Sequence, residues 1–439
     1  RPRRQRAADA VAPDRGRVGV MSARRRRGPR FAAIALLAGS ALLAACADPA
    51  PTDQLRSQVL ATESSSGAEA ATPSAAGRGE PDPRAEAATV ANDASTDPTN
   101  VTRSGSSSGP PPTSSGEEAS AAALAGSDHR FTVAFAGDVN FAERTADRLA
   151  ADPATAFGVA APGLAAADLT VVNLETAITT GGAPEPKSFT FRAPPTALTA
   201  LKAAGVDVAS MANNHGADYG ATGLADTVAA IAQSGFPVIG IGANDAQATA
   251  PYRTTINGVD VTIFAASQVR DHTLESWTAT ATSPGIASAF DPRLINNVRT
   301  AAAAGSTVIV FLHWGTEYDS CPDSNQVQLA AELAAAGARA VIGAHAHVLQ
   351  GAGWRSDGVY VGYGLSNYLW WRSFGNEQDD NGVLTLTFDG NRVVASDFAP
   401  SQLDDTGVPV PATGAQQARI RAEWDQVRGC ADLSGEPPG

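Results

Sequence analysis

The sequence contains few cysteines, few aromatic residues and no apolar run long enough to span a membrane. Of its 439 residues, 3 are cysteine and 6% are aromatic. The apolar run at residues 31–45 has about fifteen residues, whereas a membrane-spanning helix needs about twenty. Because thiolates are so scarce, the donors available to a metal ion are oxygen and nitrogen atoms, which excludes a soft-metal site.

Basic residues are also in deficit. The chain has 32 Lys and Arg against 45 Asp and Glu, which gives a net charge of −13. Residues 1–46 hold eleven Arg and two Asp, a net charge of +9, so the rest of the chain carries −22. A surface this acidic repels polyanions, and nucleic-acid binding through a broad basic surface is therefore not expected. Any bound anion needs a local positive centre, and a metal ion would supply one.

The N-terminal segment has the features of a targeting signal. A basic stretch at residues 24–30 precedes the apolar run, as in secretory signals. The run ends at Leu43-Ala44-Ala45-Cys46, which resembles a bacterial lipobox. We therefore expect an extracytoplasmic protein attached to the cell membrane by a lipid on Cys46. The alternative is an ordinary secretory signal with a chance cysteine, and Met21 could be the true translation start.

Residues 47–128 have the composition of an unfolded linker. They are rich in Ala, Ser, Gly, Pro, Thr, Asp and Glu, with hardly any aromatic or large aliphatic side chains. Such a stretch cannot bury enough apolar surface to fold. Some eighty flexible residues have a span of roughly 50 Å. We therefore expect a disordered tether that holds a folded domain away from the membrane.

Two cysteines remain if Cys46 is lipidated, namely Cys321 and Cys430. An even pair in an oxidising compartment favours a disulfide. This bond would tie the C-terminal tail, residues 401–439, to the segment that follows His313. The alternative is two free thiols.

The folded domain is predicted at residues 129–400. Apolar runs predict strands at 131–136, 169–172, 206–209, 237–241, 259–265, 307–312, 339–342 and 359–363, and helical patterns lie at 142–151, 195–204, 222–234, 292–304 and 325–336. A hairpin is predicted at 382–398 with Asp389-Gly390 in its turn, and a short helix at 415–428. Strands that alternate with helices predict an α/β fold. The antiparallel pair is compatible with a sandwich of two sheets flanked by helices.

Five predicted strands deliver polar side chains at their ends, where loops held by a sheet usually carry ligands and catalytic groups. The segments are Gly137-Asp138, Asn173-Leu174-Glu175, Asn213-Asn214-His215, His313-Trp314-Gly315 and Gly343-Ala344-His345-Ala346-His347. Carboxylate, amide and imidazole donors suit Mn²⁺, Fe, Zn²⁺, Ni²⁺ or Mg²⁺. Two such ions about 3.5–4 Å apart can clamp a phosphoryl group. Glu175 is the candidate for the carboxylate that bridges them.

Taken in this order, and with Glu317-Tyr318 after the fourth segment, the five segments resemble the bacterial capsule synthesis protein (CapA) family. That family is related to the calcineurin-like metallophosphoesterases. The resemblance covers about residues 130–400. It implies a four-layer α/β/β/α sandwich of metallophosphatase type, on an extracytoplasmic, membrane-attached protein of poly-γ-glutamate or capsule production, with polymer synthase membrane subunits as partners.

The resemblance also implies a role for each motif residue. Asp138 and His347 would bind a first metal ion, Glu175 would bridge, and a second ion would take three further ligands: Asn214, His313 and His345. His215 would be the general acid that protonates a leaving oxygen, because the pKa of an imidazole lies near neutral pH. It would stand just outside the ligands. Six more side chains would support the ligands: Asn140, Asn173, Asn213, Arg192, Glu317 and Asn367. Arg192 and Glu317 could equally be plain surface charges.

The chain departs from the phosphoesterase pattern in its first motif. The phosphoesterases have Asp-x-His, whereas Asn140 is the second residue after Asp138 here. The first metal ion would lose a strong ligand, so the site could hold either one divalent ion or two. Two function classes follow: a metal-dependent phosphoesterase, which His215 favours, and a non-catalytic partner of a polymer synthase, which Asn140 favours. Trp354, Trp370 and Trp371 are expected to cover the rim of the site or to pack in the core.

Overall fold

The computed structural model describes residues 129–439. The signal segment, Cys46 and the predicted linker lie outside the described residues. Within residues 129–439, no helix combines the length and the apolar character that a membrane crossing requires.

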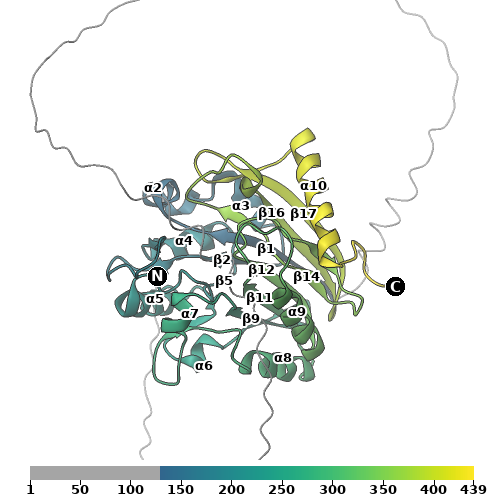
Figure 1. The fold of residues 1–439 in the computed structure, drawn as a ribbon, viewed down its shortest axis with the longest axis horizontal. Helices are drawn as coiled ribbons and strands as arrows, with labels where there is room; N and C mark the ends of the chain where they lie inside the picture. Colours follow the sequence, from purple (N-terminus) through teal and green to yellow (C-terminus); the bar gives the residue numbers. More distant parts are fainter. Residues whose placement is uncertain (1–128) are drawn as a thin grey trace, which may run out of the picture. The chain divides into compact units, whose positions relative to one another are not determined.

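Two β-sheets packed against each other form the centre of the domain (Figure 1). The 8-stranded sheet has the order β18 (Pro409–Pro411), β17 (Arg392–Leu403), β16 (Asp380–Asp389), β1 (Arg130–Val139), β2 (Leu169–Leu174), β5 (Val208–Ser210) and β6 (Val238–Ile239), and β15 (Asn367–Leu369) also pairs with β1. The 6-stranded sheet has the order β13 (Ala352–Trp354), β14 (Tyr360–Gly362), β12 (Ala338–Ala344), β11 (Thr307–His313), β9 (Val259–Ser267) and β8 (Tyr252–Ile256). The central strands of both sheets are parallel, so their carboxyl ends form one edge in each sheet.

Helices cover the outer face of each sheet. The larger ones in chain order are α2 (Glu143–Ala151), α4 (Thr196–Ala203), α5 (Gly220–Ser234), α8 (Arg293–Ala303), α9 (Ser324–Ala336) and α10 (Gly414–Arg428), with the short α3 (Ala161–Leu164), α6 (Asp245–Ala248) and α7 (His272–Trp277) between them. Helices α4 and α5 share a hydrophobic core with the 8-stranded sheet, whereas α8 and α9 pack on the 6-stranded sheet. The architecture is therefore the predicted four-layer α/β/β/α sandwich.

The period-2 alternation of a strand explains why β11 lies between two apolar layers. Ile309 and Phe311 face the other sheet, where the rings of Phe311 and Phe135 lie 6.4 Å apart. Val308, Val310 and Leu312 face the core formed with helices α8 and α9. Because both faces of the strand are buried, its sequence is a continuous apolar run and not an alternating one.

All the predicted strands and helices are present, but several short elements were not predicted: β3 (Ala177–Ile178), β4 (Arg192–Ala193), β10 (Gly285–Ile286), β13, β15, β18, α3, α6 and α7. Three other differences have an identifiable cause. The strand predicted at 237–241 is interrupted at Gly240, whose φ of +85° separates β6 from β7 (Ile241–Gly242). Strand β8 was not predicted, because Tyr252–Ile256 has few large apolar residues. The hairpin turn is Gly390-Asn391, one residue later than predicted, since Asp389 pairs with Arg392.

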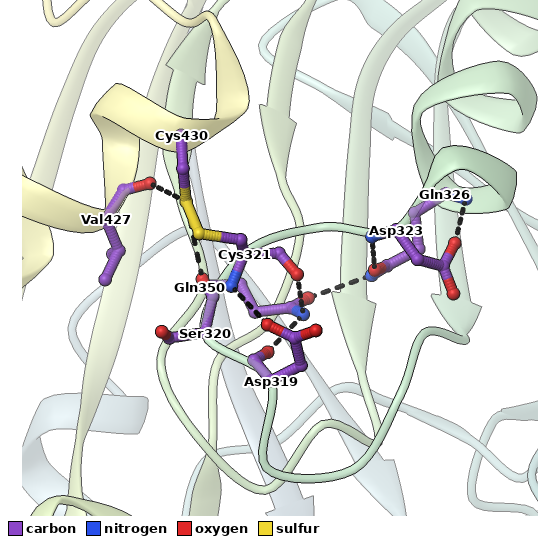
Figure 2. Close-up of a disulfide and its surroundings, with 8 residues drawn as sticks. All are labelled: Asp319, Ser320, Cys321, Asp323, Gln326, Gln350, Val427 and Cys430. Atoms are coloured by element: carbon purple, nitrogen blue, oxygen red, sulfur yellow. Dashed lines mark hydrogen bonds between the residues drawn. A yellow bond between two sulfur atoms is a disulfide. The ribbon is translucent and has the colours of Figure 1, made fainter. Parts of the chain in front are cut away.

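The C-terminal tail packs back onto the domain. In helix α10 the Trp424 ring stacks on Phe398 of β17 at 4.1 Å. Just after this helix, a disulfide joins Cys430 to Cys321, whose Cα atoms are 5.7 Å apart (Figure 2). The Gln350 amide donates to the Asp319 carbonyl at 2.7 Å beside this bond. The segment between β11 and α9 is therefore held from both sides.

Candidate metal centre

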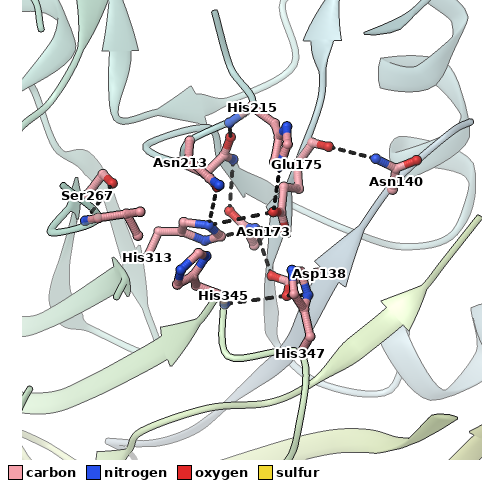
Figure 3. A network of polar contacts seen from close by, with 12 residues as sticks. Asp138, Asn140, Asn173, Glu175, Asn213, His215, Ser267, His313, His345 and His347 are labelled. Carbon is pink, nitrogen blue, oxygen red and sulfur yellow. Dashed lines mark hydrogen bonds and ion pairs between the residues drawn. The ribbon is translucent and has the colours of Figure 1, made fainter. Parts of the chain in front are cut away.

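Two carboxylates and three histidines from both sheets converge at the carboxyl ends of the parallel strands (Figure 3). Donor atoms of Glu175, His345 and His347 lie within 4.8 Å of one another, and so do donor atoms of Asp138, Glu175 and His313. All five side chains are buried. Glu175 is common to both groups, as expected of a bridging ligand. Oδ2 of Asp138 and Nδ1 of His347, which are predicted to bind the same ion, lie 3.3 Å apart.

The predicted ligand Asn214 reaches the same centre. Its side-chain oxygen lies 2.8 Å from Nε2 of His313, and that nitrogen lies 3.6 Å from Oε1 of Glu175. All six side chains that the sequence proposes as ligands are therefore neighbours, although they come from five separate segments.

The backbone is irregular at this edge. The β1–β2 register shifts between Ala136 and Asp138, a bulge that redirects the Asp138 side chain. A Cβ atom on Gly137 would lie 1.9 Å from the Ser366 carbonyl, so only glycine allows this approach. Non-glycine residues rarely adopt positive φ, yet His345 has φ +100° and His347 has φ +55°. Such strain is found where side chains must be held in functional positions.

Gly343 opens the last motif for a packing reason. A Cβ atom there would lie 2.0 Å from the indole nitrogen of Trp314. That nitrogen donates to the Tyr363 carbonyl at 2.8 Å, and the Trp314 side chain is fully buried. Trp314 therefore fixes the ends of β11 and β12 relative to each other, and so sets the spacing of His313 and His345.

The two carboxylates are held together by an amide. The Asn173 side-chain nitrogen donates to Oδ1 of Asp138 at 2.8 Å and to Oε2 of Glu175 at 3.2 Å. Asn173 in turn accepts a hydrogen bond from Asn213 at 3.0 Å. Burial and the neighbouring charge of Asp138 raise the pKa of Glu175 well above its usual range. A cation between the two carboxylates would reverse this rise.

The histidines differ in protonation. Burial and the neighbouring histidines lower the pKa of His313 and of His345 well below the usual value, so both rings are neutral and able to bind a metal ion. Burial also lowers the pKa of His347, but Asp138, whose Oδ2 lies 3.3 Å from its Nδ1, outweighs burial and raises it. Asn367 lies 2.8 Å from the same nitrogen and supports the ring.

His215 lies directly beside the candidate ligands. Its Nε2 is 3.7 Å from Oε1 of Glu175, and its Nδ1 is 2.6 Å from Asp218. Burial lowers the pKa of His215, and the charge of Asp218 opposes this. Asp218 also bonds Lys187 at 2.7 Å. Neither Asp218 nor Lys187 is predicted as a site residue from the sequence, although the spacing His215-x-x-Asp218 could have indicated a paired acid.

Three of the predicted supporting residues differ in how they relate to the centre. Asn140 does not take a ligand position, because its amide nitrogen donates to the backbone carbonyl of Glu175 at 2.9 Å. Arg192 is exposed and stacks on Tyr219 at 4.7 Å, with no contact to the ligands among the described interactions. Glu317 is exposed at the mouth of the centre, where its charge contributes to raising the pKa of Glu175.

The family model of the bacterial capsule synthesis protein PGA_cap matches residues 132–370, more than half of the chain. The chain belongs to this family. All the residues of the centre lie within the matched segment.

Curated relatives agree with the family. The chain is 30% identical over 222 residues to the capsule biosynthesis protein CapA of Bacillus anthracis, covering 50% of this chain and 53% of that protein. It is 28% identical over 250 residues to the PGA biosynthesis protein CapA of Bacillus subtilis (strain 168), covering 55% and 64%. A polyglutamine synthesis accessory protein of Mycobacterium tuberculosis (strain CDC 1551 / Oshkosh) is 32% identical over 192 residues, covering 42% and 50%. The chain thus spans about half to two thirds of the length of these relatives.

Solved structures share part of the arrangement. The NAD nucleotidase of Haemophilus influenzae superposes with a TM-score of 0.37 at 11% identity, over 70% of this chain and 57% of that one. A sulfate thiohydrolase of Thermus thermophilus gives a TM-score of 0.33 at 14% identity, over 60% and 41%.

Proposed function

We propose that the chain is an extracytoplasmic, lipid-anchored protein of capsule or poly-γ-glutamate synthesis or export that acts as a metal-dependent phosphoesterase. The observation that carries the proposal is the buried centre of Asp138, Glu175, His313, His345 and His347. Clusters of buried ionisable groups in which neutral imidazoles face carboxylates are typical of functional sites.

The chemistry of the centre fits divalent ions. Oε1 of Glu175 and Nδ1 of His345 are buried without a hydrogen-bond partner among the described residues. A buried polar atom without a partner costs about 1–3 kcal/mol, which a bound cation would offset. Nitrogen and oxygen donors without thiolate suit Mn²⁺, Fe, Zn²⁺, Ni²⁺ or Mg²⁺. Asp138, Glu175, Asn214 and the three histidines would hold one or two such ions.

Divalent ions in such a centre neutralise charge on a phosphoryl group and favour attack by water. The protein's own contribution centres on His215. Asp218 accepts a hydrogen bond from its Nδ1 and orients the ring, so Nε2 faces the centre. In the imidazolium form, which the charge of Asp218 favours, Nε2 would carry the proton that a leaving oxygen requires. Lys187 bonds the other oxygen of Asp218 and the carbonyl of Asn214, which fixes the loop that carries His215.

A second candidate function is supported by Asn140. The phosphoesterases carry histidine at this place, whereas the Asn140 amide is used to hold the Glu175 backbone. The centre would then bind a metal ion, or polymer carboxylates through it, as an accessory subunit of a synthase or exporter. The printed name of the mycobacterial relative, an accessory protein, agrees with this alternative.

The cellular location and the partners are part of the same proposal. A lipid on Cys46 would place the domain outside the cytoplasmic membrane, beside the membrane subunits of a polymer synthase. Cys46→Ala should move the protein from the membrane fraction or leave its precursor unprocessed. Unchanged fractionation together with an unchanged mass would refute the anchor.

Metal analysis combined with phosphodiester and phosphomonoester assays separates the two functions. We expect the full chain to retain divalent metal, and His345→Gln to lose it, while His129→Gln, outside the centre, behaves as the wild type. Metal retention with hydrolysis supports the phosphoesterase, and retention without hydrolysis supports the accessory role. Failure of the wild type to retain any divalent ion would contradict both.

A further inference from the structure

An aromatic surface with one arginine lies beside the metal centre. We call it the Arg372 rim and define it by five residues: Phe189, Tyr318, Trp371, Arg372 and Phe374. The Arg372 guanidinium lies 4.4 Å from the ring centre of Phe374, 4.8 Å from that of Trp371 and 5.6 Å from that of Phe189. Phe189 is 50% exposed and Tyr318 is 47% exposed, so solvent reaches the rim. Arginine held between aromatic faces keeps its N–H edge available for an anion.

Ring contacts connect the rim to the metal centre. The Tyr318 ring lies 6.1 Å from His347, and Trp370, which precedes the rim, lies 4.9 Å from the same histidine. On the other side, Phe191 lies 4.5 Å from His215 and 5.8 Å from Trp371. Ring contacts therefore link the rim to the centre through both His347 and His215.

Arg372 lacks an acidic partner in the part of the chain that the structure describes. None of the ion pairs within residues 129–439 includes it, although the chain has 45 acidic residues. Its Nε is buried and has no hydrogen-bond partner among the described residues. The carboxylate of Asp379, in the same loop, is occupied by the Ser373 hydroxyl at 2.7 Å and by the Gly375 N–H at 2.6 Å.

The unused Nε defines the missing partner. Nε and one terminal nitrogen of a guanidinium together bind the two oxygens of a carboxylate or phosphate side by side. We propose that the Arg372 rim is a second binding subsite, which receives an oxyanion of the ligand outside the metal centre. The inference rests on the proposed function to the extent that the same ligand occupies both places. The substrate would then be an ester that carries an additional carboxylate or phosphate.

Binding can be measured without metal and without turnover. The full chain in EDTA is titrated at fixed ionic strength while tryptophan fluorescence is recorded, because Trp370 and Trp371 lie at the rim. The probes are a γ-linked glutamate pentapeptide, tripolyphosphate and, as the uncharged peptide, the same γ-linked pentapeptide with every carboxylate amidated and its amino terminus acetylated. The charged probes distinguish a carboxylate from a phosphate, and the uncharged peptide controls for stacking alone.

We expect at least one charged probe to bind, and Arg372→Gln to weaken it about tenfold or more. The probe affinity of Arg372→Lys should lie between those of the wild type and Arg372→Gln, since lysine keeps the charge but loses the paired contact. Arg192→Gln is the matched control, because Arg192 also stacks on a ring, 4.7 Å from that of Tyr219. Thermal melting and circular dichroism check that each variant is folded. If Arg372→Gln is not folded, the binding comparison is made with Arg372→Lys instead.

Two results would overturn the subsite: no charged probe binds the wild type, or Arg372→Gln and Arg192→Gln bind alike. Hydrolysis and metal content are measured on the same preparations. Probe binding that depends on Arg372 without hydrolysis by any preparation leaves the subsite standing and removes the phosphoesterase. Hydrolysis without an effect of Arg372 on binding overturns only the subsite.

Discussion

The disulfide between Cys321 and Cys430 should contribute a large part of the domain's stability. The two cysteines are 109 residues apart in the chain, so the bond closes a loop of about 110 residues in the unfolded state. The loss of chain entropy for a loop of this length corresponds to about 5 kcal/mol at 25 °C. Residual structure in the unfolded state reduces this figure, and we expect about 2–5 kcal/mol.

The assay is urea unfolding of the oxidised protein and of the Cys321→Ser/Cys430→Ser variant. Both proteins carry Cys46→Ser, so that no third thiol exchanges with the bond. With a slope of about 3 kcal/mol/M, the midpoint should fall by roughly 1 M or more. Alkylation of thiols before and after reduction tests whether the bond is present. If the two midpoints coincide although alkylation shows that the bond is formed, the disulfide does not contribute this stability.

Three further predictions concern the centre and the pH dependence of stability. Divalent metal at one hundred times its Kd should raise the melting temperature of the wild type by about 4 °C. Glu175→Gln should lose this shift, because both donor groups contain Glu175. An equal shift in both proteins would contradict the shared ligand. His215→Asn should lower phosphoesterase kcat by about 100-fold or more with metal content unchanged, and equal rates would remove His215 as the acid. Burial raises the pKa of Glu423 to about 7, so the free energy of unfolding should fall as pH rises from about 4.5 to 7 and then level off. A pKa shift of this size corresponds to about 3 kcal/mol of unfolding free energy, which solvent screening reduces to about 1 kcal/mol. Urea midpoints against pH should be flatter for Glu423→Gln, and parallel curves would count against this origin.

The sequence predicted the layers well because both sheets are buried on both faces. Runs such as 307–312 and 339–342 are long and apolar, which identifies them as strands without knowledge of their partners. Short edge strands such as β8 escape this reasoning, because none of the five residues of β8 is fully buried. The break at Gly240 also escaped it, since a close approach to Ala212 and not the local sequence requires the positive φ there.

The candidate ligands were predictable for a similar reason. Polar residues directly after buried strands are unusual, and parallel strands present their carboxyl ends at one edge. The partners of those ligands were harder to find. Asp218 meets His215 within one loop, whereas Lys187 reaches Asp218 only because the loop around residue 187 folds over the segment after β5. An Asp three residues after a His has many other roles in proteins.

The sequence by itself determined the class of the fold and the kinds of donor atom, because periodicity and side-chain chemistry are local properties. Only the tertiary structure decided which donors share a space, since distances between β1, β2, β5, β11 and β12 depend on how two sheets pack. It placed Glu175 in both donor groups and turned Asn140 toward the backbone. It also left Arg372 without an acidic partner among the described residues, because the fold directs the nearby Asp379 to backbone N–H groups.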